Sequence, residues 1–278
     1  MKIRNLLYII GTVLIMSSCA TTSFYQVYDV KPIEESITKT DELFFEDDNC
    51  KITYNLWANG GNIGFNFYNK TDSKIFIKLN ESNFVLNGFA YDYFKNRTFT
   101  TSESKSASTS STSTGSVAVT GLNVYNNIQT NQVKSSSSEN LSSSVGYAVS
   151  IKEDSIVCIP PKTTKRISEY SINYSLIRNC DLFKYPRTKE IKTVSYIESE
   201  SPIVFSNKIT YEINGNSKEV TNEFYVSEIT NYPESEFFES KAEEFCGQKS
   251  SYATKYYKYY DIDKFYIKYD KGTDYWKH

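Results

Sequence analysis

The sequence predicts a mainly β fold, an antiparallel β-sandwich. Three observations lead to this prediction. Apolar and polar residues alternate with a period of two in many short segments, and dipeptides typical of tight hairpin turns separate those segments. Aromatic residues, which favour strands, make up 15% of the chain. Because successive side chains point to opposite faces of a strand, this alternation indicates strands with one face in a core.

The segment from residue 50 to residue 94 carries the clearest alternation. Ile63, Phe65 and Phe67 alternate with polar residues or glycine, and the same pattern returns at Ile75 and Ile77. We expect five strands in this segment, joined as an antiparallel meander. Turn signals separate the strands at residues 59–61, 69–72 and 87–88.

A second group of strands follows a break in the pattern. A short apolar strand from Ile156 ends at Pro160-Pro161, because proline cannot donate a hydrogen bond to a neighbouring strand. A hairpin is expected around Asn214-Gly215. This spacing of strands is typical of an immunoglobulin-like sandwich or a related topology. Further alternating segments lie at residues 145–151, 164–177, 209–226 and 265–269.

Between the two groups lies an insertion rich in serine and threonine. Thirteen of the seventeen residues from Thr100 to Ser116 are Ser or Thr. Such a segment has too little apolar surface to offset the entropy lost on ordering. We therefore expect a mobile insertion over about residues 100–141, with a glycosylated or partner-binding loop as the functional alternative.

One helix is predicted, over residues 234–246. Phe238, Ala242 and Phe245 fall on one face at helical spacing, acidic residues come early, and Gly247 suits a C-terminal cap. The glutamates of this segment are expected to form a solvated helix face.

Catalytic chemistry is restricted by the histidine content, because His278 at the end of the chain is the single histidine. A chain terminus is a poor place for a catalytic base, which argues against Ser-His-Asp, Cys-His and histidine-zinc catalysis. Carboxylate chemistry of the glycosidase type needs only two acids and stays open. Residues 46–49 and 261–263 carry acids that calcium binds, but both segments are expected to be solvated turns.

Four cysteines lie within the predicted domain: Cys50, Cys158, Cys180 and Cys246. An even number in an oxidising compartment permits two disulfides, with three possible connectivities. No Cys-x-x-Cys pair is present, so a thioredoxin-like motif or a zinc ribbon is not indicated.

The first nineteen residues have the organisation of a secretory signal. Lys2 and Arg4 precede an uncharged run from Leu6 to Met16 that is too short to span a bilayer. The segment Met16-Ser17-Ser18-Cys19 resembles the lipobox of bacterial lipoproteins. This resemblance implies cleavage before Cys19, diacylglycerol on its sulfur and an acylated amino terminus.

Cleavage there would remove a signal peptide of residues 1–18 and leave 260 of the 278 residues. We expect residues 19–45 to form a lipidated tether and residues 46–278 the β-sandwich domain. The mature chain would keep 29 basic residues against 33 acidic residues, a net charge of −4. This balance argues against nucleic-acid binding.

The overall style of the chain, rich in Asn, Lys, Tyr and Ile, is similar to that of Bacteroidetes lipoproteins. No charged export signal follows Cys19, so the resemblance implies an outer-membrane lipoprotein that faces the periplasm, with surface exposure left open. Asp154-Ser155-Ile156 resembles the O-glycosylation motif of these bacteria, which makes Ser155 a candidate glycan site. A turn before a strand accounts for the same three residues.

The sequence thus favours a lipid-anchored envelope protein with a non-catalytic binding or structural domain and no cofactor. Its partners would be the membrane, through Cys19, and an envelope protein or a glycan. Two alternatives remain: a carbohydrate-binding module that uses exposed Tyr252, Tyr256 and Tyr260, and a histidine-independent carboxylate hydrolase.

Overall fold

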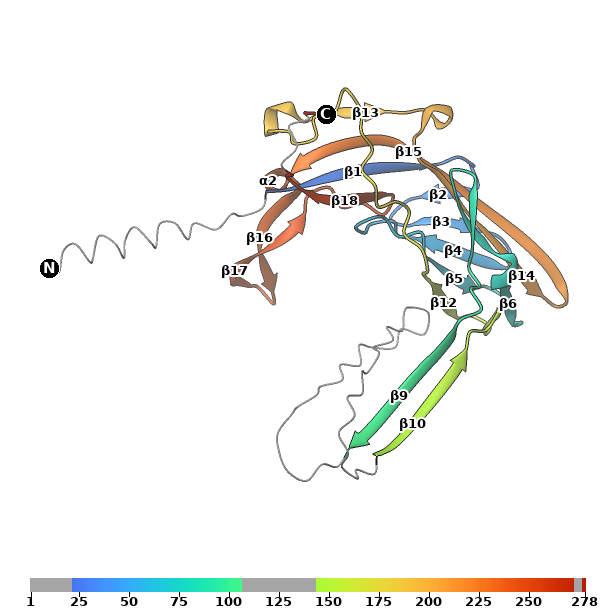
Figure 1. Cartoon of the computed structure of the whole chain (residues 1–278). Coiled ribbons are helices and arrows are strands. Elements are labelled where there is room, and N and C mark those ends of the chain that lie inside the picture. The colour runs from blue at the N-terminus through green and yellow to red at the C-terminus, as the bar shows by residue number, and fades with distance from the viewer. Residues whose placement is uncertain (1–21, 107–143, 273–276) are drawn as a thin grey trace.

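The computed structural model describes residues 22–106, 144–272 and 277–278. Its strands form antiparallel sheets, so the prediction of a mainly β, sandwich-like fold is confirmed (Figure 1). The large sheet contains β1 (Ser23–Pro32), β6 (Ile75–Lys78), β7 (Asn83–Leu86), β8 (Phe89–Asp92), β11 (Ile156–Ile159), β13 (Thr193–Ser195), β14 (Val204–Ile213), β15 (Asn216–Pro233) and β18 (Lys264–Asp270). The small sheet contains β2 (Ile37–Lys39), β3 (Leu43–Glu46), β4 (Cys50–Tyr54), β5 (Phe65–Asn69) and β12 (Thr164–Ile167).

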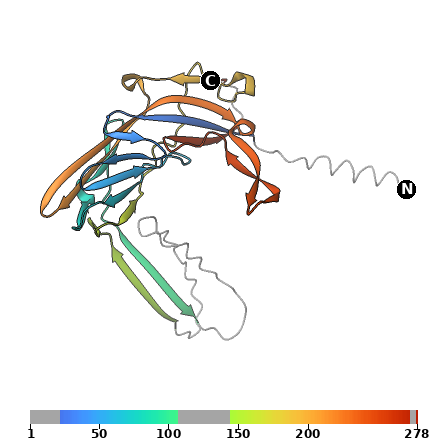
Figure 2. The same cartoon turned by 180° about the vertical axis from the view of Figure 1, so that it is seen from behind.

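Four strands belong to neither sheet. They form two separate two-stranded ribbons, β9 (Thr98–Ser106) with β10 (Ser144–Lys152), and β16 (Phe238–Phe245) with β17 (Gln248–Tyr257). Both ribbons extend away from the body in the two opposite views (Figure 2). The described helices are short: η1 (Leu79–Glu81), η2 (Thr188–Glu190), η3 (Glu198–Glu200) and α2 (Glu234–Phe237).

Strand β15 links the parts of the large sheet. Along one edge its first half pairs with β14 and residues 228–230 pair with β13, while its second half pairs with β1 on the other edge. The main order is β11-β6-β14-β15-β1-β18, and the order of the small sheet is β12-β5-β4-β3-β2. Figure 1 shows the long β15 curving over the molecule.

The core lies between the inner faces of the two sheets. Phe67 of β5 contacts Tyr211 of β14 with ring centroids 5.5 Å apart, and Tyr54 of β4 contacts Phe224 of β15 at 5.3 Å. Asn207 is also fully buried there, accepting a hydrogen bond from the Tyr93 hydroxyl at 2.6 Å and donating to the Ile63 carbonyl at 2.9 Å. These bonds satisfy a polar group that would otherwise be costly to bury.

The predicted hairpin turns are present. Asn87-Gly88 connects β7 to β8 and Asn214-Gly215 connects β14 to β15, with positive φ angles at all four residues. This conformation is that of a type I′ turn, whose twist matches that of paired strands. Strand β11 ends directly before Pro160, as expected.

The prediction of a helix over residues 234–246 is wrong. Only α2 is helical, and the rest forms β16, which turns through Cys246-Gly247 into β17. Both turn residues have positive φ, so Gly247 serves a hairpin turn rather than a helix cap. Pairing with β17 satisfies backbone groups that a lone helical segment would have satisfied internally.

The predicted tether over residues 19–45 is also corrected. Ser23–Pro32 is β1, which lies between β15 and β18 in the large sheet. Its side chains are buried on both faces, with Tyr28 and Val30 in the main core and Tyr25 and Val27 in a second aromatic cluster. The described fold therefore already includes Ser23–Pro32, and residues 37–46 supply β2 and β3.

Two further expectations need correction. The strands between residues 50 and 94 are antiparallel but do not form one meander, because β4 and β5 join the small sheet while β6, β7 and β8 join the large one. Residues 164–177 form a strand only as far as Ile167. The predicted insertion of 100–141 begins within β9, and its residues from 107 onward lie outside the described residues.

Candidate functional site

The β16–β17 ribbon is a long, exposed part of the described chain that carries large apolar side chains. Sixteen of the eighteen residues in its strands are exposed. Phe245 and Tyr252 are each 82% exposed. A ribbon of this kind buries little of its own surface, so its apolar side chains are available to a partner.

An aromatic base holds the ribbon to the body; it consists of Tyr25, Trp57, Phe237, Phe238, Tyr257 and Tyr266. Tyr25 of β1 stacks on Phe237 at 4.0 Å with the rings 8° apart in plane. Trp57 meets Tyr257 at 5.3 Å and Tyr266 at 5.1 Å. Burial raises the pKa of Tyr25 to about 12. Aromatic pairs of this kind fix the origin of the ribbon.

The register of the ribbon decides which side chains share a face. Glu239 lies opposite Tyr256, and Lys241 lies opposite Thr254. The Tyr256 hydroxyl donates to Glu243 at 3.2 Å, so Glu243 lies on the same face. Tyr252 lies in the stretch where the register shifts, between the Ala242–Ala253 and Glu244–Lys249 pairs. One face therefore combines Tyr256 with side chains of both charges.

The three tyrosines predicted as a sugar platform do not form one row. Tyr252 and Tyr256 lie on β17, whereas Tyr260 follows the strand and meets Trp57 edge to face at 5.4 Å. The Tyr260 hydroxyl also accepts a hydrogen bond from the Asn55 side chain at 3.2 Å. Tyr260 therefore belongs to the surroundings of the aromatic base.

The four cysteines of the predicted disulfides are free thiols in the structure. Cys50 is buried in β4, where desolvation raises its pKa, and Cys158 is partly buried in β11. Cys180 and Cys246 are exposed, the latter at the tip of the ribbon.

The remaining predicted sites have different surroundings. Ser155 lies in the bend before β11, is partly exposed, and accepts a hydrogen bond from the Leu79 amide at its own carbonyl oxygen, at 2.8 Å. Cys19 lies outside the described residues. His278 stacks on Phe183 with ring centroids 4.8 Å apart.

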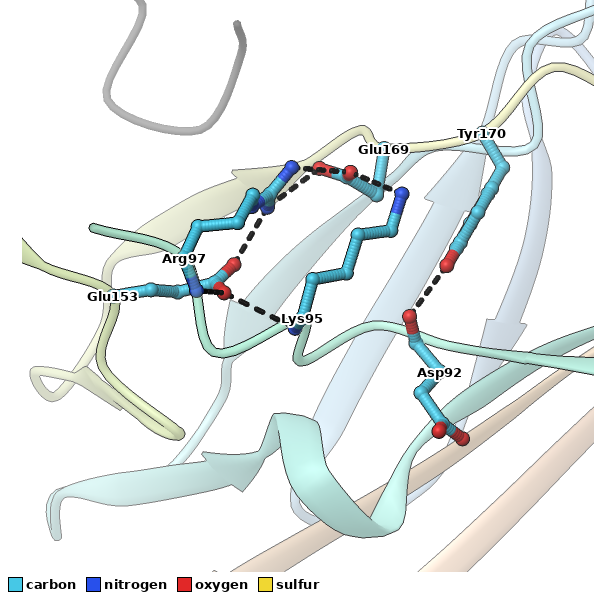
Figure 3. A network of polar contacts seen from close by, with 6 residues as sticks. All are labelled: Asp92, Lys95, Arg97, Glu153, Glu169 and Tyr170. Atoms are coloured by element: carbon cyan, nitrogen blue, oxygen red, sulfur yellow. Dashed lines mark hydrogen bonds and ion pairs between the residues drawn. The ribbon is translucent and has the colours of Figure 1, made fainter. Parts of the chain in front are cut away.

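Glu153 and Glu169 both contact Arg97 and Lys95 (Figure 3). The guanidinium lies 2.6 Å from Glu153 and 2.7 Å from Glu169, and Lys95 lies 2.8 Å from Glu169. Burial acts to raise the pKa of Glu153, but hydrogen bonds from Arg97 and from two backbone amides outweigh it, so this pKa is lowered. Glu153 follows β10 and binds Lys95 and Arg97, which precede β9, so it connects the two ends of the β9–β10 ribbon and has a structural role.

A second carboxylate pair has opposed pKa shifts. The Lys39 ammonium lies 2.9 Å from Asp261 and 2.6 Å from Asp263. Burial and the neighbouring Asp261 charge raise the pKa of Asp263, whereas the Lys39 contact outweighs burial and lowers that of Asp261. Neither residue lines the groove described below.

The acidic segment 46–49 is a turn. Asp47 accepts hydrogen bonds from the Asn49 and Cys50 amides, both at 2.7 Å, and from the Tyr211 hydroxyl at 3.1 Å. Burial acts to raise the Asp47 pKa, but these bonds outweigh it and the pKa is lowered. Within the described ranges, no group of three acidic, histidine or cysteine side chains is placed to bind a metal ion.

Comparisons with protein-family models, with curated proteins and with solved structures gave no match. Among the described residues, no helix has the length and apolar character needed to cross a bilayer.

Substitution of Arg97 tests the assignment of its carboxylates as structural. In Arg97→Met we expect the free energy of unfolding at pH 7 to fall by about 1–3 kcal/mol, because two mostly buried carboxylates lose their charged donor. In the wild type, a lowered Glu153 pKa adds stability above about pH 4.3, the unfolded value, and this is lost as pH falls through the folded value. Urea unfolding at pH 7 and pH 4 measures both effects.

The variant should show a smaller acid-side loss of stability, because only the hydrogen bonds from the Lys95 and Arg97 amides to Glu153 remain. Lys208→Met is the matched control, because Lys208 forms an exposed ion pair with Glu219 at 3.1 Å. This substitution should change the free energy of unfolding by less than about 0.5 kcal/mol. An unchanged pH dependence in Arg97→Met would show that the Arg97 contacts do not hold Glu153 ionised.

Proposed function

We propose that this chain is a lipid-anchored protein of the bacterial cell envelope whose β domain binds another envelope component without catalysing a reaction. The lipobox-like segment Met16-Ser17-Ser18-Cys19, placed directly after an apolar run, supports the anchor. An outer-membrane protein facing the periplasm is the proposed location. Several acyl chains on Cys19 would hold the chain firmly, since a single chain binds a membrane only marginally.

The observation that carries the binding role is the β16–β17 ribbon. It is held by a buried aromatic base but exposes nearly all of its length. Phe245 and Tyr252 are each 82% exposed, so they contribute little buried apolar surface to the core. Large aromatic side chains are enriched at protein interfaces, where one end of the ring is buried and the other hydrogen-bonds.

A protein partner fits the ribbon better than a glycan. Tyr256 shares its face with Glu239, Lys241 and Glu243, and Tyr252 is exposed further along β17, so the ribbon offers apolar contact and charges of both signs. Among the described residues, β16 and β17 pair only with each other, so each keeps an open edge for strand addition. A glycan-binding role stays the alternative, and it would use these two tyrosines without Tyr260.

A carboxylate hydrolase is less well supported. Arg97 and Lys95 together neutralise one acidic pair, and Lys39 contacts both members of the other. A glycosidase needs two carboxyl groups facing a substrate across several ångströms of open space. We therefore propose that the chain is not an enzyme.

Intact mass spectrometry of membrane-extracted protein tests the anchor. The wild type should begin at Cys19 and carry lipid, whereas Cys19→Ala should retain residues 1–18 and carry none. Reduction should leave the mass unchanged because the four remaining cysteines are free thiols. A wild type without lipid would refute the anchor, and a gain of hydrogens on reduction would refute the free thiols.

Photo-crosslinking in living cells tests the ribbon. With p-benzoylphenylalanine in place of Tyr252, we expect one crosslinked product of discrete mass that contains a second envelope protein. Phe76 on β6 is the matched control position, at 37% exposure. Crosslinking of equal yield from both positions, or from neither, would contradict the proposal. Retention of the wild type on a glycan array would instead favour the glycan alternative.

A further inference from the structure

A groove lies at the end of the body where β1 begins. Its volume is about 650 Å³, and its walls come from the start of β1, residues 183–190, the end of β15, and Lys271 and Lys277. Thr22 lines the groove, and its carbonyl accepts a hydrogen bond from the Lys271 amide at 3.0 Å. The groove is thus built around the residue through which the chain enters the fold.

The charge of this groove is opposite to that of the chain. Its lining includes Arg187, Lys271 and Lys277 against the single acid Glu190, a net charge of +2. The whole chain carries −2. Both lysines are exposed, and the Arg187 side chain is 88% exposed.

Acidic residues also lie beside the groove. Glu234 lies 3.1 Å from Lys255, Glu236 lies 3.4 Å from Lys258 and accepts a hydrogen bond from the Thr188 hydroxyl at 3.1 Å, and Asp270 accepts one from the Ser23 hydroxyl at 2.7 Å. Within the lining itself, three basic side chains outnumber the single acid, so the lining favours an anion.

Aromatic rings form the floor and one wall of the groove. Phe24 contacts Tyr185 with ring centroids 5.1 Å apart and Tyr269 at 5.8 Å. The Tyr185 hydroxyl accepts a hydrogen bond from the Gly272 amide at 3.0 Å, which links this wall to the segment of Lys271. Aromatic and basic side chains together are typical of surfaces at the membrane–water interface.

The length of the chain between Cys19 and Thr22 limits how far the groove can lie from a lipid on Cys19. Three residue steps separate Cys19 from Thr22, and an extended chain spans at most about 3.6 Å per residue. Thr22 therefore lies within about 11 Å of Cys19, and a lipid on Cys19 would keep it at about that distance from the membrane surface. The groove cannot move far from the headgroup layer.

We infer that this groove binds the phosphate headgroups of anionic lipids in the membrane that holds the Cys19 anchor, so that the domain lies against that membrane in one orientation. The inference rests on the proposed lipid anchor. Lys271, Lys277 and Arg187 supply the positive charge, and the aromatic wall lies at the level of the headgroups. The β16–β17 ribbon, which starts beyond α2, is then presented at a fixed angle to the membrane.

Lysine footprinting of the lipidated full chain tests this inference. The protein is reconstituted in vesicles of phosphatidylglycerol or of phosphatidylcholine and treated with a membrane-impermeant amine-acetylating reagent. Peptide mass spectrometry then compares Lys271 and Lys277 with Lys208 and Lys218, which lie on β14 and β15 near the hairpin turn at the opposite end of β15. These control lysines normalise for protein that faces the vesicle lumen.

We expect the acetylation rate of Lys271 and Lys277, relative to the controls, to be about fivefold lower in phosphatidylglycerol than in phosphatidylcholine. The difference should disappear in about 1 M salt, where the Debye length is about 3 Å. Equal relative rates in the two kinds of vesicle would overturn the inference. Intact mass of the same preparation separates the two failures: absence of lipid refutes the anchor, and lipid without protection refutes the groove.

Discussion

The insertion of β1 between β15 and β18 is the constraint on which the rest of the molecule depends. Both edges of β1 are paired, and Tyr28 stacks on Phe265 of β18 at 4.5 Å. Gln26 on the same strand donates to Asn231 of β15 and to the Ile177 carbonyl, both at 2.9 Å. The first strand thus binds segments from the last third of the chain, so the sheet is complete only when both ends of the chain have folded.

This constraint connects the proposed anchor to the proposed function. Because β1 starts at Ser23, a lipid on Cys19 would hold Thr22 within the roughly 11 Å that three extended residues span. The face of the domain around Thr22 must then tolerate the headgroup layer, and its basic and aromatic groove is suited to it. The aromatic base packs on the other face of β1 through Tyr25. The orientation of the ribbon therefore also depends on β1.

Local signals in the sequence predicted the parts of the fold that local physics determines. Asn-Gly pairs predicted two hairpins because few residues accept the positive φ angles of these turns. Strand β1 was missed because it is buried on both faces and so lacks alternation, and its polar Gln26 and Asp29 resemble a linker. The residues of β16 fit a helical period as well as a strand, and only pairing with β17 decides between them. The groove joins four distant segments, which no local pattern reveals.

Neutron reflectometry of the lipidated protein on a supported bilayer containing phosphatidylglycerol tests whether the lipid on Cys19 holds the domain against the headgroups. The method measures the water content between headgroups and protein. The account predicts protein density that starts at the headgroup layer, with no hydrated gap wider than the roughly 11 Å that three extended residues span. A wider water-filled gap would contradict it, since it would mean that the anchor is not at Cys19 or that β1 does not start at Ser23.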